Sequence, residues 1–107
     1  MDHERRQLVR QYLRVSAVLH TEEATPINVH LIDIGKAGVS LNASHQIATG
    51  LTVQLHFGVP INGNLEKIIA TGRITYCTPS PPGFKVGMLF STLEPDVQAI
   101  IAAYLQA

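Results

Sequence analysis

The chain has 107 residues, of which 46% are hydrophobic and 15% are charged, a balance that fits one packed globular domain and excludes a disordered chain. Eight basic and eight acidic residues give a formal charge of zero, so bulk electrostatics does not recruit DNA, RNA or an anionic membrane. The single cysteine, Cys77, excludes an intrachain disulfide and is compatible with a reducing compartment.

Residues 1–12 are predicted to form a mobile, basic N-terminal arm. Half of the eight basic residues lie within the first fourteen positions, at Arg5, Arg6, Arg10 and Arg14. A guanidinium group binds phosphate bidentately, recognises the edge of guanine or stacks on a purine. Arg6 and Arg10 share one side of a helical turn, or lie about 13 Å apart in an extended arm at roughly 3.3 Å per residue. Either spacing suits a ligand with more than one phosphate, and a solvated charged terminus is the alternative interpretation.

Residues 13–91 are predicted to form about six short β-strands separated by turns. The candidate strands, which are rich in β-formers or alternate apolar with polar residues, are 13–19, 27–32, 39–42, 51–57, 67–78 and 84–90. In the clearest of them, 51–57, four apolar residues point one way and three polar residues the other. Residues 58–64 are predicted to form a hairpin loop, and Gly72 indicates a bulge or a close approach of the backbone.

Residues 95–106 are predicted to form a terminal helix. Pro95 suits the first helical position, and Asp96 suits the positive end of the helix dipole. The apolar residues that follow recur on one side at helical spacing, so the helix is expected to lie on the sheet and close one end of the core. A small antiparallel barrel is the predicted architecture, because closing a sheet removes its exposed edges.

The turn after the second apolar strand contains an Asp-x-Gly-x-x-Gly pattern that begins at Asp33. A carboxylate at the end of a strand can accept two N–H bonds from guanine, or it can cap a turn. Gly35 and Gly38 allow the backbone to approach a ligand closely or to adopt positive φ. This pattern is weak by itself, and a plain Asp-initiated turn is the alternative.

The two patterns together resemble the PilZ family of bacterial cyclic di-GMP receptors. Arg6 and Arg10 match the Arg-x-x-x-Arg motif of that family, and Asp33 and Gly38 match its Asp/Asn-x-Ser-x-x-Gly motif. Segments 72–74 and 83–90 and the closing helix are also similar to the family. The resemblance covers nearly the whole chain and implies a stand-alone, single-domain member, residues 1–107. It also implies a six-stranded antiparallel β-barrel with a C-terminal α-helix, in agreement with the strand count.

The resemblance implies a site for cyclic di-GMP. The residues expected to bind the ligand are Arg5, Arg6, Arg10, Asp33, Gly35 and Gly38. Arg73 or Tyr76 is expected to stack on a guanine, although an exposed strand arginine and a core or rim tyrosine are the simpler interpretations. Gly35 stands where the family has serine, and the lost hydroxyl is expected to cost about 0.5–1.5 kcal/mol, or up to about tenfold in affinity.

The predicted function is a receptor that orders its N-terminal arm on binding cyclic di-GMP and signals to an unidentified effector protein. The alternative is an adaptor of the same fold that binds no nucleotide, in pilus biogenesis or motility. Whether one or two nucleotides bind stays open.

No enzymatic activity, metal or cofactor is expected, and no nucleic-acid partner. Asp33 is the only acid–base candidate near the motifs, the five histidines show no metal-ligand spacing, and Cys77 lacks a partner motif. No apolar run approaches the roughly 18–20 residues that a membrane span needs, and the N-terminus has no secretory-type segment. A cytoplasmic location without membrane insertion is therefore expected.

Overall fold

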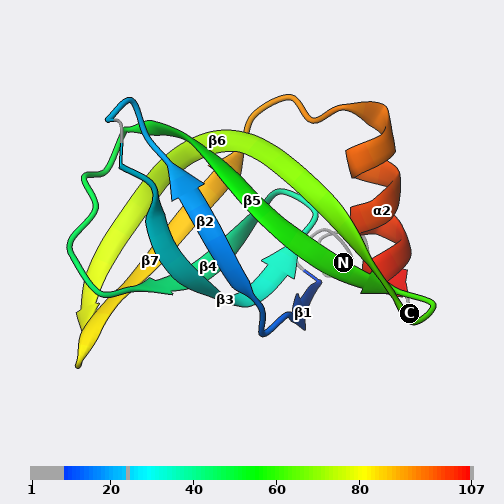
Figure 1. Ribbon diagram of the computed structural model, residues 1–107, viewed down its shortest axis with the longest axis horizontal. Coiled ribbons are helices and arrows are strands. Elements are labelled where there is room, and N and C mark those ends of the chain that lie inside the picture. Colours follow the sequence, from blue (N-terminus) through cyan, green and yellow to red (C-terminus); the bar gives the residue numbers. More distant parts are fainter. Residues whose placement is uncertain (1–8, 24, 107) are drawn as a thin grey trace, which may run out of the picture.

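Six antiparallel strands close into a barrel in the computed structural model of the chain, which describes residues 9–23 and 25–106 (Figure 1). Within these residues one short strand precedes the barrel and one helix follows it. The elements in chain order are β1 (Arg10–Tyr12), β2 (Ser16–His20), β3 (Ile27–Gly35), β4 (Gly38–Ala43), β5 (Thr52–Ile61), β6 (Asn64–Ser80), β7 (Gly83–Phe90) and α2 (Pro95–Gln106). The predicted fold class is confirmed.

The barrel closes because β3 pairs with both β2 and β4. Around the ring the strands follow the order β2, β5, β6, β7, β4, β3, and every neighbouring pair is antiparallel. Each of the six strands therefore has a hydrogen-bonded partner on both sides, which removes the exposed edges that an open sheet would have.

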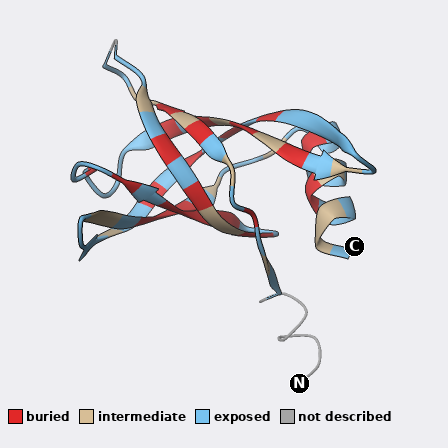
Figure 2. Ribbon diagram, turned by 60° about the horizontal axis from the view of Figure 1, so that its bottom comes forward, coloured by how far each residue is buried: buried red, intermediate tan, exposed pale blue. Residues whose placement is uncertain are grey.

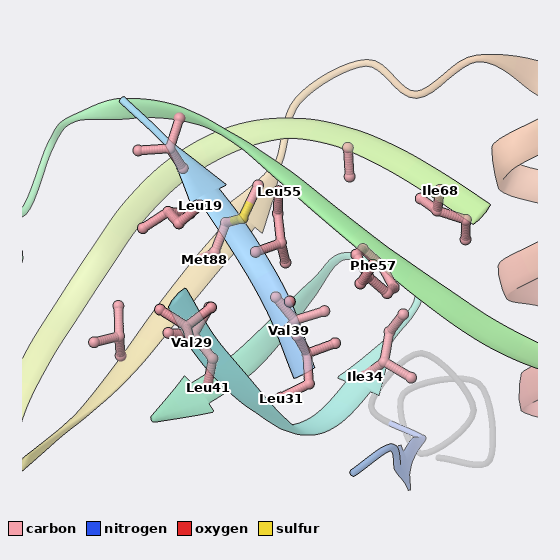
Figure 3. Packing of buried hydrophobic residues seen from close by; sticks show 14 of the residues in the cluster. Leu19, Val29, Leu31, Ile34, Val39, Leu41, Leu55, Phe57, Ile68 and Met88 are labelled. Carbon is pink, nitrogen blue, oxygen red and sulfur yellow. The ribbon is translucent and has the colours of Figure 1, made fainter. Parts of the chain in front are cut away.

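The core is built from the alternation that the sequence displays. Buried and exposed residues alternate along the strands (Figure 2), and side chains such as Leu19, Val29, Leu41 and Leu55 point into the barrel from four different strands (Figure 3). Leu51, predicted to share the inward face of the 51–57 strand, precedes β5 and is 38% exposed. The inward set of that strand therefore begins at Val53.

The hairpin between β5 and β6 is tighter than predicted. The strands extend to Ile61 and from Asn64, so the loop predicted over 58–64 reduces to the two residues Asn62 and Gly63. Both have positive φ, at 51° and 82°. Asn-Gly is the preferred pair for a two-residue hairpin turn, because these residues adopt positive φ at low cost.

Helix α2 begins at Pro95 and ends at Gln106, at the predicted boundaries. Asp96 Oδ1 accepts a hydrogen bond from the backbone N–H of Val97 at 3.0 Å, and Val97 and Ile101 are buried. The helix packs on β5 and β6 (Figure 1). No helix in the described part of the chain is long and apolar enough to cross a membrane.

Strand β1 contains the last three residues of the predicted arm. It pairs with the Gly35 end of β3, and the backbone between β1 and β2 stays bonded to β3 through Leu13 N–H to Ile32 O and Leu31 N–H to Val15 O. Helix α2 also holds β1, because the Tyr104 hydroxyl donates to the Tyr12 carbonyl oxygen. Residues 1–8 of the arm, including Arg5 and Arg6, lie outside the described residues.

Two strands contain register shifts, and neither shift is at Gly72. One lies in β3 between Leu31 and Asp33, and the other lies in β6 between Ile74 and Tyr76. At Gly72 the close approach is found instead, since a Cβ atom there would lie 2.3 Å from the carbonyl oxygen of Leu89. Of the two roles predicted for this glycine, the structure therefore selects the close approach.

Candidate functional site

Asp33 is on the outer surface of the barrel because of the bulge in β3. In a regular strand Asp33 would point the same way as Leu31, which is buried in the core. The bulge adds one residue, Ile32, against β4, so that Ile34 takes the next core position. The Asp33 side chain consequently faces outward and is 23% exposed.

Arg10 and Asp33, predicted from two separate motifs, form an ion pair. The pairing of β1 with β3 brings Arg10 alongside the end of β3. Its Nε and Nη2 atoms donate to Asp33 Oδ1 at 3.0 and 2.7 Å. Both bonds end on the same carboxylate oxygen, and the Arg10 side chain remains 41% exposed. Asp33 lies within β3 and not in the turn predicted for it, and strand pairing brings it to the predicted arm.

Tyr76 reaches the same place because of the bulge in β6. Ile74 is buried, and the added residue Thr75 turns Tyr76 to the outside. The Tyr76 ring lies over Gly87, where a Cβ atom would be only 2.1 Å from the ring carbon Cε2. Only a glycine at position 87 therefore leaves room for this ring.

One row of residues connects these features across four strands. Strand pairing aligns Asp33 with Ser40, Ser40 with Gly87, and Gly87 with Tyr76. Ser40 Oγ lies 3.4 Å from both the Tyr76 hydroxyl and Arg10 Nη2, and the serine is 7% exposed beneath these two side chains. A continuous polar surface thus runs from Arg10 to Tyr76.

This surface borders a shallow cavity of about 410 Å³, within the usual range for ligand pockets of roughly 300–1,000 Å³. The lining residues that bear charge are Arg10, Asp33 and Lys85, two positive and one negative. The aromatic ring of Tyr76 also borders it. Cationic donors, a carboxylate acceptor and a ring together suit an anionic ligand that carries planar N–H donors.

Ser40 and Lys85 were not predicted as site residues. Each occupies an outward position between core residues of a predicted strand, Ser40 between Val39 and Leu41 in β4 and Lys85 before Val86 in β7. That alternation indicates an outward direction. It does not indicate a place near Asp33, which depends on β4 lying between β3 and β7.

The other predicted residues have different positions. Gly38 lines the cavity, and a Cβ atom there would lie 2.2 Å from the Met88 carbonyl oxygen, so the pairing of β4 with β7 requires glycine. Gly35 lies beside Arg10. Arg73, which pairs with Thr52 and Leu89, is not among the lining residues.

A larger cavity of about 850 Å³ lies between α2 and the β3–β4 turn. Its lining is mostly apolar and includes a single charged residue, Lys36. The smaller cavity is therefore the better candidate for an anionic ligand, although Ala37 borders both.

The opposite side of the barrel holds a histidine pair. The ring centroids of His20 and His56 are 4.3 Å apart, and Gln54 Oε1 lies 3.0 Å from His56 Nε2. Burial and, secondarily, the neighbouring His20 lower the pKa of His56 below its usual 6.5. Within residues 9–23 and 25–106 no three His, Cys, Asp or Glu side chains are grouped to hold a metal ion.

Comparisons with known proteins address the fold and the family. The PilZ domain model matches residues 4–107. The chain is also similar to the structure of the Bacillus subtilis inhibitor of motility, MotI/DgrA, with a TM-score of 0.78 and 16% sequence identity. That similarity covers 92% of this chain and 48% of the other, so the chain spans about half of the longer protein. At this identity the structural match establishes a shared fold. The search of curated proteins gave no match.

Proposed function

The chain belongs to the PilZ domain family, and on that premise we propose that it is a cytoplasmic receptor for cyclic di-GMP that signals to a partner protein. PilZ domains are non-catalytic, and the chain is accordingly not an enzyme. The observation that carries the proposal is the contact between Arg10 and Asp33. These residues come from the two motifs of the family and meet beside one cavity.

Each group of the site has a chemical role in this proposal. Asp33 accepts hydrogen bonds from guanine N–H groups, while Arg10, together with Arg5 and Arg6 of the arm, binds phosphate. Lys85 adds positive charge at the cavity, and the Tyr76 ring provides a surface on which a base can stack. The ligand replaces the Arg10 guanidinium at Asp33 and draws residues 1–8 toward the barrel.

The signal follows from the attachments of β1. This strand carries Arg10 on the ligand side, and Gln11 and Tyr12 contact Leu105 and Tyr104 in the last turn of α2. A ligand that moves Arg10 therefore acts on a strand that also supports the helix. The partner protein reads the resulting change of surface.

Titration calorimetry with cyclic di-GMP tests the proposal. We expect a dissociation constant in the micromolar range or tighter, and loss of binding in Arg6→Ala and Arg10→Ala. Arg73→Ala is the matched control, because this exposed strand arginine lies outside the cavity. Equal losses in Arg10→Ala and Arg73→Ala would contradict the assignment of the site.

A nucleotide-independent adaptor is the second candidate function, in pilus biogenesis or motility. Two observations favour it: Gly35 replaces the family serine, and Arg10 already occupies one carboxylate oxygen of Asp33, Oδ1. The similarity to a structure described as an inhibitor of motility points to the same kind of process. Absence of heat on titrating concentrated protein with cyclic di-GMP would support the adaptor and reject the receptor.

A further inference from the structure

Gly35 leaves a space that the Arg10 side chain uses. A Cβ atom at position 35 would lie 3.0 Å from Arg10 Nη1, 3.4 Å from Arg10 Cγ and 3.3 Å from the carbonyl oxygen of Val9. These are its three nearest contacts, and all belong to the segment that carries Arg10. The backbone itself does not require glycine here, since the glycines with positive φ in the described chain are Gly50 and Gly63.

We propose that Gly35 is a positioning residue that seats Arg10 on Asp33 and thereby sets the affinity of the site for its ligand. This inference rests on the proposed function, and it concerns the regulation of the same site. Without a ligand, Arg10 occupies Asp33 Oδ1, one of the two oxygens that would bind a guanine. Gly35 permits this contact between Arg10 and Asp33, because it has no Cβ atom to meet the Arg10 side chain.

The strand register supports this role. Arg10 pairs directly with Gly35 in the β1–β3 ladder, and directly opposed residues place their side chains on the same face. Asp33, two residues from Gly35, shares that face. The Arg10 side chain can therefore lie across position 35 and reach Asp33 Oδ1 through both Nε and Nη2.

A serine at position 35, as in the family, would disturb this position of the Arg10 side chain. A separation of 3.0 Å between its Cβ atom and Nη1 is too short, so the guanidinium would have to shift by a few tenths of an ångström. The bond of 2.7 Å to Asp33 leaves little room for that shift. Ser40 Oγ already lies 3.4 Å from Arg10 Nη2, so a hydroxyl group is present beside Arg10 without a serine at position 35.

Competition with Arg10 predicts the direction of the effect on affinity. A ligand that uses both carboxylate oxygens of Asp33 must first displace an exposed ion pair, which corresponds to about two- to fivefold in affinity. Weakening the contact of Arg10 with Asp33 should therefore increase the affinity for the ligand by about two- to fivefold. The absence of a serine hydroxyl at position 35 is expected to lower the affinity instead, so the two effects of Gly35 have to be measured separately.

Gly35→Ala and Gly35→Ser separate them, because alanine adds the Cβ atom without the hydroxyl. The first measurement needs no nucleotide: the Arg10 Nε–Hε resonance in ¹⁵N NMR spectra of the full chain. In the wild type we expect a resolved, exchange-protected signal that disappears in Asp33→Ala. In Gly35→Ala it should shift and lose protection, while the backbone amide spectrum of β5 and β6 is retained.

The second measurement is titration calorimetry of the same variants with cyclic di-GMP. We expect Gly35→Ala to bind about two- to fivefold more tightly than wild type, and Gly35→Ser at least as tightly as Gly35→Ala. An unchanged Arg10 signal in Gly35→Ala would contradict the positioning of Arg10 by Gly35, whatever the nucleotide affinity is.

Weaker or equal binding by Gly35→Ala would contradict the effect on affinity. If the wild type binds no nucleotide, the receptor and the affinity effect both fail, whereas the NMR result still decides whether Gly35 seats Arg10.

Discussion

The two sides of the barrel differ in the regularity of their strand pairing. Strands β5 and β6 pair over ten consecutive residues, from Thr52↔Arg73 to Ile61↔Asn64, without a shift. The β3–β4 and β6–β7 pairings each contain one bulge. We call the β2–β5–β6 side, with β6 as far as Arg73, the regular wall. We call the β3–β4–β7 side, with residues 75–80 of β6, the bulged wall.

The bulges account for the chemistry of the bulged wall. Each bulge inserts one extra residue into its strand, so that the residue after it faces outward and the following one faces the core. In β3 these residues are Asp33 and Ile34, and in β6 they are Tyr76 and Cys77. The regular wall keeps strict alternation, and both walls contribute fully buried side chains to the core. The polar surface beside the cavity lies on the bulged wall, so we expect ligand binding to depend on that wall.

The largest effect is expected from a core truncation in the regular wall. Leu55→Ala removes a fully buried side chain and should lower the free energy of unfolding by about 2–5 kcal/mol. Asp33→Ala, on the bulged wall, should lower it by less than about 1 kcal/mol, because it removes only a partly exposed ion pair. Urea unfolding of the two variants measures both. Comparable losses of stability would contradict the minor contribution assigned to the ion pair.

Asp33→Ala should instead act mainly on ligand binding. Hydrogen bonds to a charged group are worth about 1.5–3 kcal/mol, so the affinity for cyclic di-GMP should fall by about 10- to 150-fold. Calorimetry measures the change, with Gln54→Ala on the outer face of the regular wall as the control expected to bind like wild type. Retention of affinity in Asp33→Ala would exclude the carboxylate from the site.

Tyr76 and Arg73 test the bulge in β6. Tyr76→Ala should cost about 1–3 kcal/mol of binding free energy through the loss of stacking. Arg73→Ala, three residues earlier and before the bulge, should leave binding unchanged because Arg73 lies outside the cavity. Fluorescence or calorimetric titrations compare the two variants. A loss confined to Arg73→Ala would show that the stacking residue was assigned to the wrong side of the bulge.

The smallest effect is a pH dependence located in the regular wall. Burial and His20 lower the pKa of His56 in the folded chain, so a proton binds more readily to the unfolded chain. The contribution of His56 to stability is therefore complete above pH about 6.5 and is lost as the pH falls through the lowered pKa.

Urea unfolding at pH 7.5 and at successively lower pH measures this contribution. His56→Gln should reduce the pH dependence most and His20→Gln should reduce it partly, since burial is the larger cause. His45→Gln should leave it unchanged. A wild-type stability that rises as the pH falls through this range would contradict the assigned direction.

Much of the fold follows from local patterns in the chain. Alternation placed six strands, and Pro95 and Asp96 placed the helix within its observed limits. The Asn-Gly pair at 62–63 also carried enough information to fix the hairpin, although the surrounding Gly and Pro residues favoured a longer loop.

The candidate site was predictable in part. The two motifs supplied Arg10, Asp33 and Gly38, which the fold brings to one cavity. Ser40 and Lys85 were not found, because their positions beside Asp33 depend on the order of β3, β4 and β7. Arg73 and Tyr76 were equivalent candidates until the bulge between them determined which one reached the cavity.

The sequence alone determined which residues are apolar, how they alternate and where the chain can turn, since these properties depend on neighbours a few positions away. Tertiary structure decided where an extra residue enters a ladder, which strands lie side by side, and that Arg10 lies over Gly35 onto Asp33. Bulges and registers are properties of two strands at once, and their positions depend on packing between residues far apart in the chain.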